Sequence, residues 1–211
     1  MLADTVHAGY AALMPGLTWI KPAGAEYVSV DIGDGWLAAS GVTISADPLP
    51  YHLEYTLTCV DGYITRDLSV RVSGAGWNRG LHLTRKPDGA WHAHSRSDGD
   101  VDLPPVMADG AALDGALDCD LGLSPLTNTM PVLRHGLLGG GGPVDLLMAF
   151  VSVPDLSVFP NAQRYTFVRA AAAPSGGAVI NYASGSFTAD ITFDADGLVV
   201  DYPEIGTRPH L

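Results

Sequence analysis

Apolar and polar residues alternate along most of the chain, which is the pattern of strands with one buried face. The alternation is clear over residues 55–60 and 68–72, and again over 187–193, where every second residue is apolar. Turn sequences follow these stretches: Lys86-Pro87-Asp88-Gly89 predicts one hairpin, and Asp194-Ala195-Asp196-Gly197 predicts another before a strand over 198–202. The whole pattern predicts about ten strands, mostly antiparallel and locally connected.

Helical periodicity is weak in this sequence. Residues 3–14 have a loosely helical pattern that Pro15-Gly16 would end, and residues 154–161 have room for a short helical turn. A sheet of many strands has to curl or close to avoid long exposed edges. We therefore expect an all-β fold, a single curled antiparallel sheet that forms an open or incompletely closed barrel with little helix. Since no linker interrupts the pattern, residues 1–211 are expected to form a single domain.

Composition and charge exclude several classes of partner. The 211 residues are 47% apolar, enough for a substantial core, and the net charge of −12 with only 11 scattered Lys and Arg argues against nucleic acid. No basic segment followed by an apolar run opens the chain, and the most apolar stretch, 143–154, is too short to span a bilayer as a helix. These features and the two cysteines, Cys59 and Cys119, favour a cytoplasmic protein that is not integral to the membrane; whether the cysteines pair is left open.

The clearest chemical pattern lies in the central segment, residues 113–134, which reads LDGALDCDLGLSPLTNTMPVLR. Alternation in an expected strand places Asp114, Asp118 and Asp120 on one face. The apolar face of that strand would hold Leu113, Leu117, Cys119 and Leu121. The acidic face is either exposed to solvent or the wall of a polar pocket. In the following irregular run around Asn128, polar side chains either satisfy local backbone groups or face a ligand.

The central segment resembles the core motif of the bacterial putative glycolipid-binding family, in which an Asp-x-Asp-Leu strand end precedes a Thr-Asn-Thr-Leu-Pro-Ile-Arg-Arg run. In this chain Leu133 replaces the first arginine of that pair and leaves Arg134 alone. The resemblance runs from about Glu26 to Arg208. It includes Gly89-Ala90-Trp91, Gln163-x-Tyr165 and Gly197-Leu198-Val199-x-Asp201-Tyr202-Pro203. It implies a fold similar to lipid-carrying half-barrels with an apolar interior, and a lipid or glycolipid as the small-molecule partner.

From this resemblance we expect non-enzymatic binding of a lipid or glycolipid in the concave apolar face of the sheet, with no cofactor. Large side chains of the strands would either line that face or simply fill the core. They are Trp36, Tyr55, Trp77, Trp91, Phe150, Tyr165, Phe187 and Phe193. The side chains expected to bind the ligand are Asp118, Asp120, Asn128, Arg134, Trp91 and Tyr165.

Two other functions stay open. Asp118 and Asp120 lie roughly 7 Å apart along an extended strand, and such a pair could act as acid and base in a hydrolase of a glycoside or ester. Alternatively, the sheet face could bind another protein. The histidines of His92-x-His94, with His82 on the neighbouring strand, are of a type that binds metals. Because the alternation places them on the solvent face, no metal site is expected.

Overall fold

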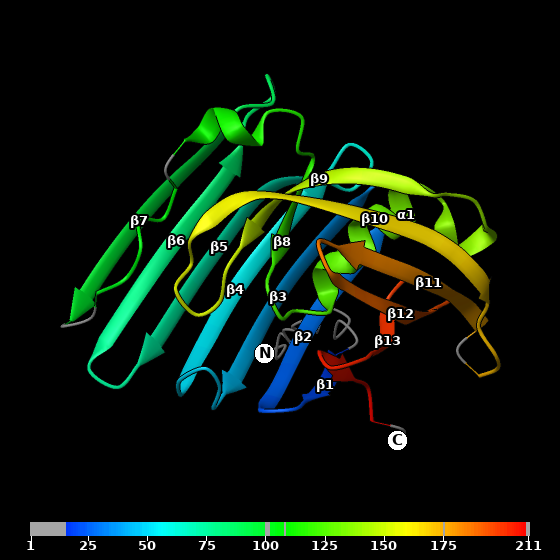
Figure 1. Cartoon of the computed structure of the whole chain (residues 1–211), viewed down its shortest axis with the longest axis horizontal. Helices are drawn as coiled ribbons and strands as arrows, with labels where there is room; N and C mark the ends of the chain where they lie inside the picture. The colour runs from blue at the N-terminus through cyan, green and yellow to red at the C-terminus, as the bar shows by residue number, and fades with distance from the viewer. Residues whose placement is uncertain (1–15, 100–101, 108, 175, 210–211) are drawn as a thin grey trace, which may run out of the picture.

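One sheet of 14 strands makes up the protein, as seen in a computed structural model that describes residues 16–99, 102–107, 109–174 and 176–209. The strands are β1 (Gly16–Lys21), β2 (Gly24–Gly33), β3 (Trp36–Ser45), β4 (Tyr51–Val60), β5 (Ile64–Gly74), β6 (Trp77–Arg85), β7 (Trp91–Gly99), β8 (Asp118–Leu121), β9 (Val144–Val151), β10 (Val158–Ala170), β11 (Gly176–Ser184), β12 (Phe187–Asp194), β13 (Val199–Tyr202) and β14 (Gly206–Thr207). Their order in the sheet is β7-β6-β5-β4-β3-β2-β1-β14-β13-β12-β11-β10-β9-β8 (Figure 1). Since β7 and β8 are its two edges and do not pair, the sheet stays open.

The expected all-β, open and curled sheet is confirmed, with two differences in detail. The described residues form 14 strands rather than about ten, and one of them, β14, is two residues long and too short to show a period. In addition, β8 pairs with β9 in parallel, whereas the other neighbouring strands are antiparallel. Two parallel neighbours need a long connection to bring the chain back to the same end of the sheet. The chain between β8 and β9 is such a crossover, and it contains helical turns.

The predicted hairpins are present. Residues 55–60 lie in β4 and 68–72 in β5, and the two turn sequences join β6 to β7 and β12 to β13. The helical pattern of residues 3–14 lies outside the described residues. In the stretch 154–161, which had room for a short helical turn, a single turn closed by the N–H of Leu156 and the backbone oxygen of Ser152 is followed by β10, whose first residues pair with the end of β9.

The central segment folds differently from the strand expected over it. Only residues 118–121 form β8, whereas Leu113 ends a 3₁₀ turn, η1 (Gly110–Leu113), and the backbone turns at Gly115 with a φ of 89°. After β8 come η2 (Leu126–Asn128), the helix α1 (Thr129–Arg134) and η3 (Leu137–Gly139). Pro131 lies in the first turn of α1, where the N–H that proline lacks would have no partner within the helix.

The concave face of the sheet is packed with the protein's own side chains. Figure 1 shows β8 and α1 between the half made of β1–β7 and the arch made of β9–β13. Met130 of α1 is fully buried, with its Sδ 3.0 Å from Sγ of Cys59 on β4. The cysteines Cys59 and Cys119 are both buried and unpaired. This differs from the expected open apolar face, since the crossover between β8 and β9 supplies the residues that fill it.

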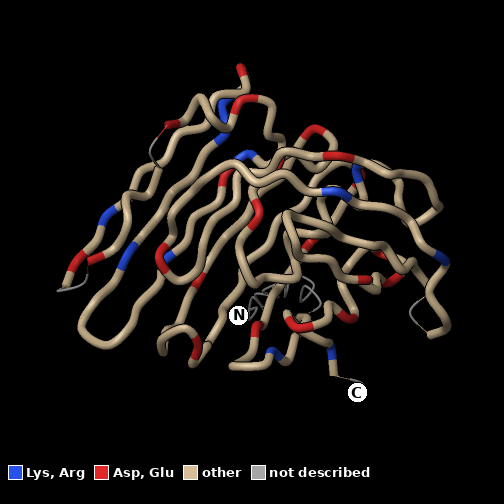
Figure 2. The backbone as a smooth tube through the Cα atoms, viewed as in Figure 1, with Lys and Arg blue, Asp and Glu red and all other residues tan. Residues whose placement is uncertain are grey.

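The basic residues are not spread evenly along the chain, because residues 16–99 contain seven of the eleven Lys and Arg. Figure 2 shows acidic residues along both halves of the chain trace, where they outnumber the basic ones. Within the described residues, no helix is both long enough and apolar enough to cross a membrane.

Candidate functional site

A hollow of about 270 Å³ opens where β8 runs into the crossover. Its floor comes from the end of β8 and from η2, and its walls come from strands β9 to β13. The lining residues are Asp120, Gly122, Leu123, Ser124, Asn128, Phe150, Asn161, Tyr182, Ser184, Phe187, Tyr202 and Ile205. We call this set the crossover hollow.

Asp120 supplies the carboxylate of the crossover hollow. Its side chain accepts hydrogen bonds from Oγ1 of Thr127 at 2.8 Å and from Nε2 of Gln163 at 2.6 Å. The residue is 9% exposed, and burial raises the pKa of its carboxyl group, while these two hydrogen bonds oppose the rise. Each oxygen of the carboxylate accepts one of these bonds, so each keeps a further lone pair for a ligand.

Hydrogen bonds of Tyr165 hold the side chains of Asn128 and Gln163 in place beneath the hollow. The hydroxyl of Tyr165 lies 2.9 Å from Oδ1 of Asn128 and 3.1 Å from Oε1 of Gln163. Nδ2 of Asn128 donates to the backbone oxygen of Pro125 at 3.3 Å. Because Tyr165 is buried and does not line the hollow, it orients the floor rather than facing a ligand. The network therefore holds Asp120 and Asn128 in place before any ligand arrives.

Asn161, on β10, brings hydrogen-bond donors to the hollow. Its Oδ1 accepts from Nε2 of Gln163 at 3.0 Å and from Oγ of Ser184 at 2.9 Å. These bonds define which end of the amide is the oxygen and leave Nδ2 of Asn161 without a partner among the described residues. The amide thus presents free N–H groups to the same hollow as the carboxylate of Asp120.

Aromatic rings form another part of the lining. The ring of Tyr182 lies 5.9 Å from that of Tyr202 and 6.0 Å from that of Phe187, and the rings of Phe187 and Tyr202 are 6.3 Å apart. Tyr165 packs edge-on against Tyr182 from below, at 5.3 Å and 77°. Tilted packing at these distances is favourable between aromatic rings and keeps the wall rigid.

The other residues predicted to bind a ligand lie away from the crossover hollow. Asp118 is 1% exposed, and its two oxygens accept hydrogen bonds from both terminal nitrogens of Arg134, one of them at 2.7 Å. Burial raises the pKa of Asp118, and the Arg134 guanidinium opposes that rise. Trp91 is buried on β7, where its Nε1 donates to the backbone oxygen of Ala116 at 3.1 Å. Of the six predicted residues, Asp120 and Asn128 line the hollow and Tyr165 supports it.

The chemistry of the hollow suits a ligand rich in hydroxyl groups. Asp120 is its single carboxylate, and no Lys, Arg or His is among its lining residues. A second acid, Glu26, is fully buried and does not line the hollow itself. One of its oxygens accepts a hydrogen bond from Oγ of Ser124, which does line the hollow, at 2.5 Å. The same oxygen accepts from the hydroxyl of Tyr55, and Lys21 pairs with the other. In the described part of the chain, no group of three metal-binding side chains occurs.

Among the polar and aromatic lining residues outside the central segment, Asn161, Tyr182 and Ser184 were not singled out from the sequence. Asn161 and Ser184 meet because β10 and β11 pair with Arg164 opposite Ala183. That register is a tertiary fact, and the alternation of one strand does not reveal it. Tyr202 did carry a signal, since it belongs to the closing motif of the family resemblance.

The comparisons with known proteins agree with this fold. The chain is similar to a crystal structure of a DUF1089 family protein from Pseudomonas aeruginosa, with 27% sequence identity and a TM-score of 0.64 over 98% of this chain and 100% of the other. A comparison with curated proteins finds no match. The family model described as putative glycolipid-binding matches residues 17–208, which confirms the resemblance seen in the sequence. The chain therefore belongs to the putative glycolipid-binding family.

Proposed function

We propose that this protein binds a glycolipid without transforming it, and that the crossover hollow holds the uncharged sugar of its head group. The observation that carries the proposal is the composition of the hollow: the carboxylate of Asp120 and the amide of Asn161 share the lining with four aromatic rings, and no cation is among the lining residues. The family description supports a binding role in general.

The size of the hollow limits which part of a lipid it takes. Sites for drug-sized ligands have volumes of roughly 300–1,000 Å³, and the crossover hollow, at about 270 Å³, is just below that range. A single sugar ring suits such a space, whereas acyl chains do not. The chains of the lipid would therefore lie outside the hollow.

A hydroxyl group both donates and accepts hydrogen bonds, and the hollow offers a partner for each. A sugar hydroxyl donates to the free lone pairs of Asp120 and accepts from the free N–H groups of Asn161. Hydrogen bonds to an ionised group are stronger than those between neutral groups. The C–H face of the sugar would pack on Tyr202 and Phe187, because the face of an aromatic ring carries partial negative charge.

The same geometry favours binding over hydrolysis. An acid and base pair needs two carboxyl groups that both reach the scissile bond. Asp120 lines the hollow, but Asp118 is bound on both oxygens by Arg134 and does not line it. Glu26 stays behind Ser124 with both oxygens bonded.

The proposal is tested with a short-chain alkyl glucoside, titrated below its micelle concentration and followed by nuclear magnetic resonance. We expect saturable shifts at residues of the crossover hollow, and none with the alkyl alcohol of equal chain length. Asn161→Ala should weaken binding roughly two- to tenfold, the usual range for one hydrogen bond. Asn181→Ala is the matched control, because the amide of Asn181 bonds to Asp190 and Thr188 and does not line the hollow.

Two results would contradict the proposal. Equal binding of the alkyl alcohol and the alkyl glucoside would mean that the sugar is not recognised. Release of free glucose that disappears in Asp120→Asn, with folding unchanged, would favour the hydrolase instead.

We also propose that the protein works in the cytoplasm. The two buried, unpaired thiols of Cys59 and Cys119 are compatible with a reducing compartment. Fractionation of cells that produce the protein at its natural level tests this, and recovery outside the cytoplasm would refute it.

A further inference from the structure

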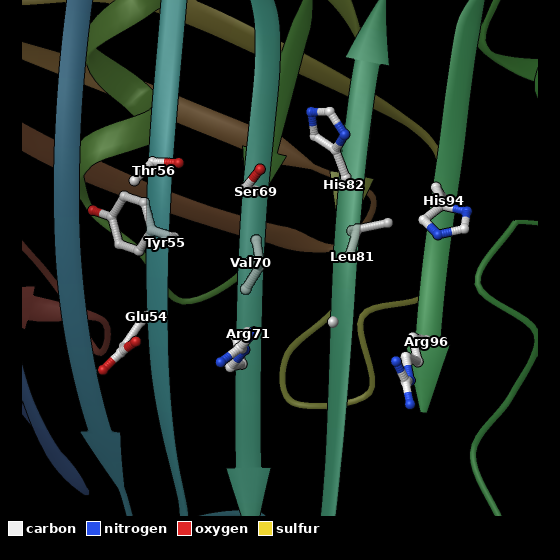
Figure 3. A pocket seen from close by; sticks show the side chains of 11 residues that line it. Glu54, Tyr55, Thr56, Ser69, Val70, Arg71, Leu81, His82, His94 and Arg96 are labelled. Carbon is white, nitrogen blue, oxygen red and sulfur yellow. The ribbon is translucent and has the colours of Figure 1, made fainter. Parts of the chain in front are cut away.

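The outer face of the sheet carries a second hollow, of about 370 Å³, on the half opposite to the crossover hollow (Figure 3). Strand pairing places Arg71 of β5 and Arg96 of β7 directly across from Gly80 of β6, one on each side. In the neighbouring row, His82 lies between Ser69 and His94. Figure 3 shows the two arginines at one level, on either side of the strand that carries Gly80. We call this hollow the arginine notch.

The glycine of the arginine notch has no structural reason to be a glycine. A Cβ atom at Gly41 would lie 2.4 Å from the ring of Tyr55, so packing excludes a side chain there. At Gly80, by contrast, the nearest atoms to such a Cβ are two backbone oxygens at 3.9 and 4.0 Å, which is ordinary contact, and φ is not positive. The pairing of β6 is also regular on both sides, without a bulge.

Glycine weakens the interior of a strand, and where no bulge or bend explains it, it marks the close approach of a ligand or of another backbone. Gly80 leaves the floor of the notch open to the depth of the β6 backbone. Its two neighbours in the row are cations, so an anionic ligand fits the space.

The arginines of the notch are not held in ion pairs among the described residues, although Glu54 on β4 lies directly across from Arg71. Neither Arg71 nor Arg96 forms an ion pair or a side-chain hydrogen bond within the described part of the chain, and both are exposed. Other arginines, such as Arg134 and Arg208, are paired with carboxylates. Although the chain has 11 Lys and Arg against 23 Asp and Glu, two exposed arginines flank this one gap without an ion pair in the described part of the chain.

The dimensions suit one small anion. Neighbouring strands are about 4.8 Å apart, so the backbones of β5 and β7 lie roughly 10 Å apart across β6. From that distance two guanidinium groups can converge on one tetrahedral oxyanion, which arginine binds through paired N–H groups. The imidazoles of His82 and His94 add donors one row away. Glu54 lines the far side of Arg71 and is the one carboxylate of the notch.

We propose that the arginine notch is a binding site for a phosphate group, separate from the crossover hollow. Arg71 and Arg96 clamp the phosphate oxygens from both sides, and Gly80 lets the group sit close to the sheet. The phosphate belongs either to a soluble phosphate compound or to the head group of a lipid.

The first probe is inorganic phosphate, added to the full chain at constant ionic strength, with the arginine Nε–H and histidine signals followed by nuclear magnetic resonance. We expect saturable shifts at Arg71, Arg96 and His94. Arg71→Gln and Arg96→Gln should each weaken binding about tenfold or more, as expected for a hydrogen-bonded charge. Glu54→Gln should strengthen it, because it removes the repelling charge. Arg169→Gln, an equal change of charge on β10, is the control and should have no effect.

Gly80→Val separates a binding role from a structural one. Valine favours strands and a Cβ atom has room above Gly80, so the melting temperature should stay or rise, while phosphate binding should be lost. Vesicles of phosphatidylcholine with and without phosphatidic acid then identify the source. Retention that requires phosphatidic acid and Arg71 assigns a lipid phosphate, and binding of inorganic phosphate alone assigns a soluble one. Phosphate shifts that survive in Gly80→Val, or no response to either probe, would overturn the proposal.

Discussion

Replacing Arg134 with methionine should destabilise the protein strongly. Arg134 and Asp118 were both expected to bind a ligand, but in the structure they form a buried ion pair with each other. Arg134 ends α1 and is 12% exposed, while Asp118 on β8 is 1% exposed. In Arg134→Met the carboxylate of Asp118 stays buried and loses the cation that faces both of its oxygens. Breaking a buried pair from one side typically costs about 3–5 kcal/mol, because the remaining charge is uncompensated.

This loss is a large share of the stability of an ordinary domain, which is about 5–15 kcal/mol. For a chain of this length, each kcal/mol lowers the melting temperature by roughly 2–4 °C. The expected decrease is therefore roughly 6–20 °C. It should shrink as the pH falls, because a protonated Asp118 no longer carries an uncompensated charge.

The matched variant removes both charges. Asp118→Leu combined with Arg134→Met should be within about 1 kcal/mol of the wild type, since an apolar pair often replaces a buried ion pair without loss. Urea unfolding followed by tryptophan fluorescence gives the free energies of all four proteins of this double-mutant cycle. A cost below about 1 kcal/mol for Arg134→Met alone would show that the pair is not buried as described.

Two further predictions concern the core and the crossover hollow. Phe193→Ala should cost about 3–5 kcal/mol in urea unfolding, since Phe193 is fully buried on β12; a cost below about 1 kcal/mol would put the register of β12 in question. For Asp120, burial raises the pKa in the folded state above its unfolded value, so the folded protein holds this proton more tightly. The wild type should therefore lose stability relative to Asp120→Asn as the pH rises from about 4, the ordinary carboxyl pKa, through the raised value. Parallel stability curves for the two proteins over that range would exclude a raised pKa.

The sequence predicted the fold best where a strand has one buried face. Over 187–193 the alternation placed Ile191 and Phe193 in the core, and both are fully buried on β12. Phe187 has the same parity but is half-buried, because it reaches the rim of the crossover hollow. Alternation reports which way a side chain points and not how far the packing extends around it.

The central segment could not be predicted to the same extent, because it is buried on both faces. All four residues of β8 are buried, so alternation of polarity there does not separate core from solvent. The sequence placed Asp118, Asp120 and Arg134 in one binding site. The fold divides them, since α1 turns Arg134 back onto Asp118 and leaves Asp120 to face β10 and β11. That division depends on the crossover, whose path has no periodic signal.

The most direct test of sugar recognition is native mass spectrometry of the protein purified without detergent, with fragmentation of any lipid that stays bound. The account predicts a bound lipid that loses an uncharged sugar on fragmentation, and a lower bound fraction in Asn161→Ala than in Asn181→Ala. A bound lipid without a sugar, or equal fractions in the two variants, would contradict it.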